Sequence, residues 1–168
     1  MREWPKRSGV FNLNGGRGNL FKLDTIYFFV VSPSYKRGDA FFRFLEREIN
    51  LYDYYRKFSF SDYTDEIHKR HDIERWVENI VNSAIDVGEI ILSSEKKKIP
   101  NYYSDIFLQL AIMPQFKEID SAQFTHWVKL RNILAHEYLD IKWKQIDNFI
   151  KENSEQLKLF LDSAKKFI

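Results

Sequence analysis

The chain has 168 residues, 44% of them hydrophobic and 30% charged, which is typical of a folded globular protein rather than a disordered one. Its net charge is only +2, so any contact with nucleic acid has to come from a local basic patch. Cysteine is absent, which excludes a disulfide scaffold, thiolate zinc sites and a cysteine nucleophile, and favours the cytoplasm. The most apolar run, residues 25–31, is too short to span a bilayer, so no membrane partner is expected.

Residues 1–39 differ in composition from the rest of the chain. They hold five of the six glycines and a net charge of +4, whereas residues 40–168 have a net charge of −2. Their glycine-rich stretch lacks the Gly-Lys-Ser/Thr sequence that a P-loop requires. We therefore expect a loop-rich N-terminal extension, either a turn with one strand-like segment, a poorly ordered arm or the product of a misplaced start codon. Residues 40–168 are expected to form one helical domain.

Apolar residues at helical spacing predict the first helices of this domain. The first is expected over residues 41–58 and the second over residues 72–93, with Asp72 as its N-cap. Residues 103–113 are expected to form a short helix that is closed by Pro114.

Two further helices follow in the C-terminal part. Asp120 and Gln123 resemble a capping box that opens the next helix. Asp140 is expected to cap the last helix, whose apolar stripe extends to Ala164. No strand pattern interrupts these segments, so the sequence predicts an all-α antiparallel bundle of four long helices and one short one.

The four histidines are the candidates for metal ligands. His68 and His71 lie three residues apart, but a charged, solvated helix start explains them better than a metal site does. His126 lies within a helix and is expected to be structural. No metal site is therefore predicted.

A denser polar cluster comprises Arg131, His136 and Tyr138. On a regular helix His136 would lie about 140° from Arg131, so the three groups converge more easily if the helix frays near Ala135. A permanent cation, an imidazole and a phenol suit phosphate chemistry. From the residues alone, however, chance clustering remains open.

Residues 131–138 read Arg-Asn-Ile-Leu-Ala-His-Glu-Tyr, which resembles the R-N-x-x-x-H-x-Y signature of HEPN domains in the form found in HepT-like toxins. Residues 75–92 are similar to the second helix of that family, and residues 99–106 are similar to its connecting segment. The resemblance extends over about residues 40–168, and it implies an HEPN-type helical fold.

The resemblance also implies an activity. HepT-like proteins are two-fold homodimers that act as metal-independent endoribonucleases without a cofactor, with both copies of the motif facing one cleft. By this resemblance His136 would be the general acid or base, Arg131 would hold the scissile phosphate and Asn132 would orient the site. The 2′-hydroxyl of RNA would attack to give a 2′,3′-cyclic phosphate, and DNA would be inert.

A partner is implied as well. HepT-like toxins of type VII-like systems are paired with a minimal nucleotidyltransferase antitoxin (the MNT type), which would add AMP to Tyr138. The alternative is a non-catalytic HEPN-fold module that binds nucleotide or RNA, or that regulates a partner.

Two further groups of polar residues have both a functional and a structural interpretation. Lys96, Lys97 and Lys98 would form an RNA-contacting rim or simply a solvated helix end. Three polar residues of the second helix would support the site or form a polar seam; these are Asn79, Asn82 and Asp86.

Overall fold

The computed structural model describes residues 34–136 and 142–167, which belong to one compact unit, Pro33–Ile168. Every regular element within these two stretches is a helix, which confirms the all-α prediction. None of the described helices is both long and apolar enough to cross a membrane. The expected extension before residue 34 and the expected helix cap Asp140 lie outside the described residues.

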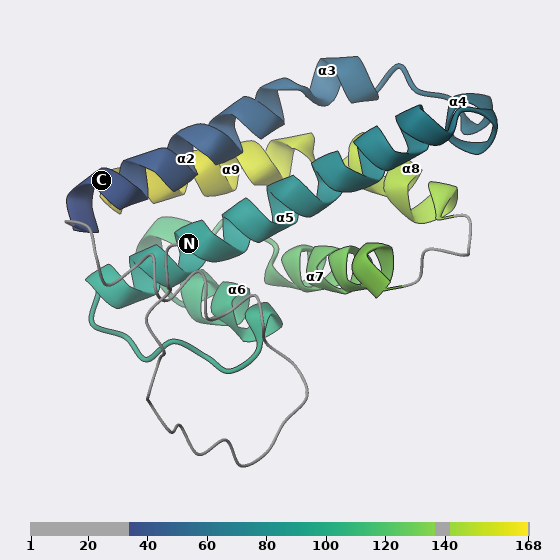
Figure 1. Cartoon of the computed structure of the whole chain (residues 1–168). Coiled ribbons are helices and arrows are strands. Elements are labelled where there is room, and N and C mark those ends of the chain that lie inside the picture. The colour runs from purple at the N-terminus through teal and green to yellow at the C-terminus, as the bar shows by residue number, and fades with distance from the viewer. Residues whose placement is uncertain (1–33, 137–141, 168) are drawn as a thin grey trace, which may run out of the picture. The chain divides into compact units, whose positions relative to one another are not determined.

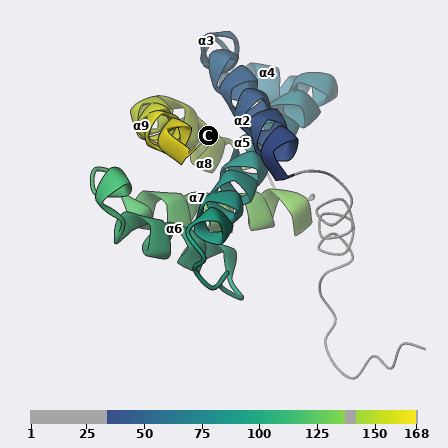
Figure 2. The same cartoon turned by 90° about the vertical axis from the view of Figure 1, so that its left-hand side faces the viewer.

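The helices follow one another with short connections. They are α2 (Ser34–Asn50), α3 (Tyr52–Tyr55), α4 (Phe60–Asp65), α5 (Ile67–Ser94), α6 (Tyr103–Ala111), α7 (Ser121–His136), α8 (Trp143–Glu152) and α9 (Ser154–Ala164). Short 3₁₀ helices precede α7 and follow α9, at Pro114–Phe116 and Lys165–Phe167. Helix α5 is the longest, with 28 residues, and it contacts α2, α4, α6, α7 and α9. It runs antiparallel to α2, with α6 and α7 on its other side (Figures 1 and 2).

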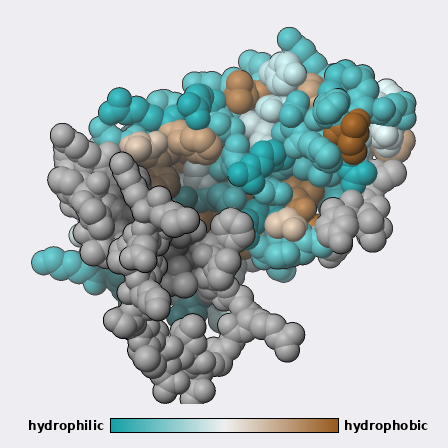
Figure 3. All heavy atoms as spheres, viewed as in Figure 1, coloured by the Kyte–Doolittle hydropathy of each residue, from teal (hydrophilic) through white to brown (hydrophobic). Residues whose placement is uncertain are grey.

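Aromatic side chains fill the interior of this bundle. Trp76 of α5 is 1% exposed, and its ring lies 4.9 Å from Tyr52, 4.4 Å from Tyr55 and 6.0 Å from Phe149. On the face shown in Figure 3, hydrophilic residues predominate and hydrophobic ones gather in small separate patches. The high aromatic content of the sequence is therefore used largely to build the core.

The first two predicted helices have different bounds in the structure. The helix expected over 41–58 is divided, since α2 already begins at Ser34 and α3 follows after Leu51. Asp72 is not an N-cap, because α5 begins five residues earlier, at Ile67. Its first turns are charged and lack an apolar stripe, and the ion pair from Lys69 to Asp62, at 2.6 Å, joins them to α4. Hydrophobic periodicity cannot detect such turns.

The end of α5 is determined by backbone geometry rather than by Pro100. Lys96 has a φ of 56°, in the left-handed region. The amide of Lys96 donates to the carbonyl of Ser93 at 3.0 Å, and that of Lys97 donates to the carbonyl of Leu92 at 2.8 Å. This pattern is a Schellman motif, which ends the helix at Ser94.

The predicted cap of α7 is confirmed in its first half. Asp120 Oδ1 accepts hydrogen bonds from the amides of Ala122, at 3.0 Å, and Gln123, at 3.2 Å. The return bond of a capping box is absent, because the Gln123 side chain donates to Asn153 instead. The amide of Asp120 donates to Gln156 Oε1 at 2.9 Å. Helix α7 is thus joined to the C-terminal helices at its first turn.

The last predicted helix is two helices. Asn153 separates α8 from α9 with φ and ψ of −116° and −7°, and it is only 4% exposed. Because both helices carry apolar residues at helical spacing, the break leaves no mark in the apolar pattern. The bond from Gln123 explains how a buried asparagine is satisfied at this position.

Candidate functional site

The residues of the R-N-x-x-x-H-x-Y motif lie at the C-terminal end of α7. Arg131 is half-buried, whereas Asn132 and His136 are exposed. Helix α7 is held against the core by its buried residues, which include Trp127 and Leu134. Tyr138 lies outside the described residues.

Arg131 and His136 are not brought together within one chain. Helix α7 is regular through His136, so the fraying near Ala135 that would ease convergence is not found within the described residues. Five residues of regular helix separate the two side chains by about 140° around the axis, whereas Asn132 and His136 are only about 40° apart. Within the described ranges no hydrogen bond or ion pair joins Arg131 to His136.

The Arg131 guanidinium has donors available for an anion. Its Nη1 donates to Asn132 Oδ1 at 3.0 Å. Its Nε is buried and has no hydrogen-bond partner among the described residues. An unsatisfied buried donor costs about 1–3 kcal/mol, and more when it is charged, so this guanidinium has hydrogen-bonding capacity that the described residues leave unused.

Two residues of neighbouring helices, Asp86 and Tyr103, interact electrostatically with Arg131, and Glu89 acts on both of them. Burial, together with the charge of Glu89, raises the pKa of Asp86, on α5, to about 7, and the charge of Arg131 opposes this shift. Burial also raises the pKa of Tyr103, at the start of α6. The charge of Glu89 raises this pKa as well, and the charge of Arg131 lowers it. The site is therefore a junction of α5, α6 and α7 around one arginine.

The sequence pointed to only part of this junction. Asp86 was expected to support the site or to belong to a polar seam, and the structure places its charge within reach of Arg131. The involvement of Glu89 and Tyr103 was missed. The three-residue spacing of Asp86 and Glu89, which puts both on one face of a helix, was the available signal.

Asp86 makes a testable contribution to stability. Its pKa is about 7 in the folded protein and close to 4 in the unfolded chain, so the folded state binds more protons between these values. Stability from this group is therefore lost as the pH rises from about 4 to 7. We expect Asp86→Asn to be about 1–2 kcal/mol more stable than the wild type at pH 8, because the amide mimics the protonated carboxyl.

Urea denaturation at pH 5 and pH 8 measures this effect. Asp72→Asn is the matched control, since it removes an exposed carboxyl of the same helix. A wild-type advantage at pH 8 over Asp86→Asn would contradict the prediction.

The other sequence-predicted residues lie apart from this junction. Lys96, Lys97 and Lys98 are all exposed in the turn that follows α5, and the described contacts do not connect them to Arg131. They begin ten residues beyond Asp86, about 15 Å along a helix. Their place in an RNA rim stays a prediction.

Histidines elsewhere give no metal centre in the described part of the chain. His68 and His71 are exposed on the first turns of α5. No group of three or more His, Asp or Glu side chains suited to a metal ion occurs among the residues that the structure describes.

A buried network holds the chain where it re-enters the described structure at Lys142. The amide of Lys142 donates to the hydroxyl of Tyr63 at 3.2 Å, and that hydroxyl donates to Glu74. Arg70 Nε donates to the same carboxylate at 3.2 Å, and the Trp143 ring lies 5.6 Å from that of Tyr63. Lys142, which follows the motif in the sequence, is thus held by hydrogen bonds to α4 and, through Tyr63, to α5.

Comparison with known proteins identifies the family of the chain. A family model described as "Ribonuclease HepT-like" matches residues 45–164, which contain Asp86, Tyr103 and the whole motif from Arg131 to Tyr138. A search of curated proteins found no match. The matched region runs from α2 to the end of α9 and includes the junction around Arg131. The chain therefore belongs to the HepT-like ribonuclease family.

Proposed function

We propose that this protein is a metal-independent endoribonuclease that acts as the toxin of a toxin–antitoxin pair. The observation that carries the proposal is the half-buried guanidinium of Arg131, whose Nε has no partner among the described residues. Membership of the HepT-like ribonuclease family supports a ribonuclease activity in general terms.

The chemistry requires no nucleophile from the protein. The 2′-oxygen of RNA attacks the adjacent phosphorus and forms a new P–O bond, while the bond from phosphorus to the 5′-oxygen breaks. In this proposal His136 takes the proton from the 2′-hydroxyl or supplies one to the leaving 5′-oxygen. Arg131 holds the phosphate and offsets the charge that develops in the transition state. The products are a 2′,3′-cyclic phosphate and a 5′-hydroxyl.

We further propose that the active form is a homodimer. Arg131 and His136 leave α7 about 140° apart, so one copy does not direct both at one phosphate. Asn132 and His136 share an exposed face of α7, and pairing of this face with its copy would bring two motifs to one cleft. Size-exclusion chromatography with light scattering measures the oligomeric state.

Regulation would act on the same cleft. We propose that a minimal nucleotidyltransferase antitoxin adds AMP to Tyr138, and that the bulky anionic group blocks the cleft and repels RNA. Lys96, Lys97 and Lys98 would then contact the RNA backbone beside the cleft. A cytoplasmic location is part of this proposal, because the RNA substrate is there.

The first experiment is incubation of the purified protein with total RNA in EDTA. We expect cleavage that leaves cyclic phosphate ends and that falls about 10²–10⁴-fold in His136→Ala, because the proton-transfer group is lost. His71→Ala, which removes an exposed histidine of α5, is the matched control and should cleave normally.

A negative result has a defined meaning. Absence of cleavage by protein whose Tyr138 is unmodified, as measured by mass spectrometry, would contradict the proposal. It would favour the alternative of a non-catalytic module that binds nucleotide or RNA.

A further inference from the structure

The connection between α5 and α6 (Figure 1), residues 95–102, combines exposed positive charge with an exposed aromatic side chain. It holds three lysines, Lys96, Lys97 and Lys98, and a single acidic residue, Glu95, so its net charge is +2. All four of these residues are exposed. Because residues 40–168 as a whole carry a net charge of −2, the connection is a local basic patch on an acidic domain.

Tyr102, the last residue of this connection, has a highly accessible ring. It is 73% exposed, and its side chain makes no hydrogen bond or ring contact with the described residues. It immediately precedes α6, but its side chain gives that helix no capping hydrogen bond. Single exposed rings are common on protein surfaces, so the position of this one decides its meaning.

Tyr102 lies beside the candidate site. The next residue, Tyr103, interacts electrostatically with Arg131, and consecutive Cα atoms are only about 3.8 Å apart. The carbonyl of Tyr102 accepts a hydrogen bond from the amide of Asp105 at 3.1 Å, which fixes its backbone at the start of α6. A base stacked on Tyr102 and a phosphate held by Arg131 can therefore belong to one short stretch of RNA.

Packing on two sides holds α6 in this position. The ring of Phe107 lies 4.6 Å from that of Phe124 on α7. Toward α5, Gly88 lets Ile106 approach so closely that a Cβ at position 88 would lie 2.6 Å from Ile106 Cγ2. Both contacts lie about one helical turn beyond Tyr103. Tyr102 is thus attached to a firmly held helix end, and its ring has only two side-chain torsions to lose on binding.

The lysines of the connection lie at a distance from Arg131 that RNA can span. Lys96 is ten residues beyond Asp86, which interacts with the charge of Arg131, so the separation is about 15 Å along a helix. This length corresponds to about four or five nucleotides at about 3.4 Å each. The acidic Glu89 lies seven residues before Lys96, about 10 Å along the helix. One strand can therefore run from the lysines past Tyr102 to Arg131.

We propose that Tyr102 is a stacking platform for an unpaired base of the RNA substrate, with Lys96, Lys97 and Lys98 holding phosphates of the same strand. The inference rests on the proposed ribonuclease function and deepens it by naming single-stranded RNA as the substrate class. Cationic side chains that follow the backbone and an aromatic ring that stacks on a base are the two elements of such binding. Every base has a π-face, so the platform accepts any base, whereas a duplex keeps these faces covered by its own stack.

A 2′-O-methylated RNA decamer of mixed sequence measures binding separately from cleavage, because its blocked 2′-oxygen cannot attack. With full-length protein and fluorescence anisotropy, we expect Tyr102→Ala to weaken binding of the decamer about tenfold. Tyr102→Trp should keep the affinity, because stacking requires only the ring. Phe60→Ala is the matched control, since it removes a 55% exposed ring at the start of α4, and it should bind normally.

Salt dependence separates the role of the ring from that of the lysines. Each phosphate contact releases counterions, so Lys97→Gln should reduce the slope of log K against log[salt] by about 0.7. Tyr102→Ala should lower the affinity at every salt concentration and leave this slope unchanged, because the ring carries no charge. The decamer paired with its complement should bind more weakly and show no effect of Tyr102→Ala.

Three results of these titrations would overturn the proposal. They are an unchanged affinity in Tyr102→Ala, an equal loss of affinity for the duplex, and no measurable binding of the decamer by the wild type at submillimolar concentration. Light scattering tests the other use of an exposed ring, a contact between two copies of the chain. A lower mass for Tyr102→Ala than for the wild type would assign the ring to that contact and would also overturn the proposal.

The stacking platform and the enzymatic function can fail separately. Cleavage of unmodified RNA by the wild type, with decamer binding that is independent of Tyr102, would defeat only the platform. Decamer binding that depends on Tyr102, without cleavage of unmodified RNA, would defeat only the proposed ribonuclease activity.

Discussion

Replacement of Arg131 by alanine is expected to lower RNA cleavage by about 10²–10³-fold, as does removal of a transition-state donor in other enzymes. The guanidinium is half-buried, and the described residues give it a single hydrogen bond, to Asn132. The rest of its hydrogen-bonding capacity is unused within the described residues. Arg131→Lys should recover only a small part of the activity, because an ammonium keeps the charge and loses the planar fork of donors.

Single-turnover cleavage of a labelled RNA measures this effect. Lys129→Ala is the matched control, since it removes an exposed cation from the same helix. Thermal unfolding of each variant separates a catalytic defect from a folding defect. Normal cleavage by Arg131→Ala would refute the proposal that this residue holds the phosphate of the RNA substrate.

Replacement of Trp76 by alanine is expected to destabilise the protein by about 3–5 kcal/mol, the usual cost of deleting a buried aromatic ring. The ring is 1% exposed, it stacks on Tyr55 at 4.4 Å and it contacts Tyr52 edge-on at 4.9 Å. Its Nε1 also donates to the carbonyl of Glu48 at 2.9 Å. The variant therefore leaves a cavity at the contact of α2 with α5 and removes one hydrogen bond of the Glu48 carbonyl, which still accepts from the amide of Leu51 at 3.2 Å.

Urea denaturation followed by circular dichroism gives this free energy. Trp76→Phe should cost less, because one ring is kept and the losses are limited to the second ring of the indole and the hydrogen bond to Glu48. Trp143→Ala is a useful comparison at a half-buried tryptophan outside this cluster. Equal losses in Trp76→Ala and Trp143→Ala would contradict the central place of Trp76 in the core.

Local signals made much of the fold predictable. The apolar ladder of α5 and the Asp120 cap of α7 depend on residues within a few turns of one another, and the structure contains both. These local signals failed where a side chain bonds to a residue that is distant in the sequence instead of to a nearby one. Gln123 bonds to Asn153 rather than closing its own capping box, and that same asparagine marks the break between α8 and α9.

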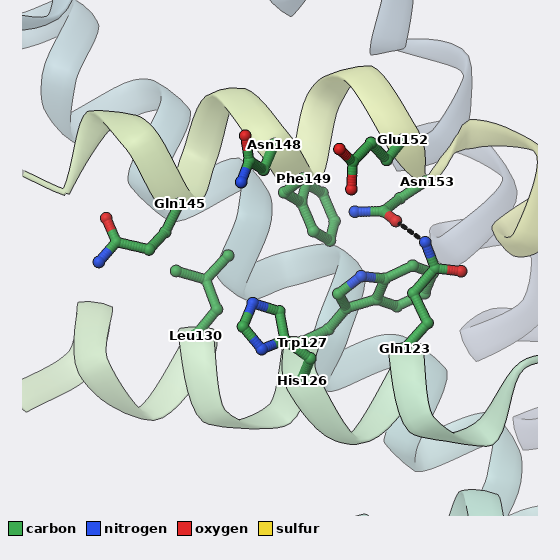
Figure 4. Close-up of a pocket in the computed structure, with 9 residues that line it drawn as sticks. All are labelled: Gln123, His126, Trp127, Leu130, Gln145, Asn148, Phe149, Glu152 and Asn153. Carbon is green, nitrogen blue, oxygen red and sulfur yellow. Dashed lines mark hydrogen bonds between the residues drawn. The ribbon is translucent and has the colours of Figure 1, made fainter.

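For the candidate site, the sequence by itself determined the motif residues Arg131, Asn132 and His136, because their spacing within one helix is a local property. Only the tertiary structure decided what surrounds them. Asp86 and Tyr103 interact with the charge of Arg131 because α5 and α6 pack against α7. A small pocket lined by residues that include Leu130 and Phe149 exists because α8 lies beside α7 (Figure 4). Such contacts join residues tens of positions apart, and their geometry depends on how whole helices pack, which no short sequence pattern encodes.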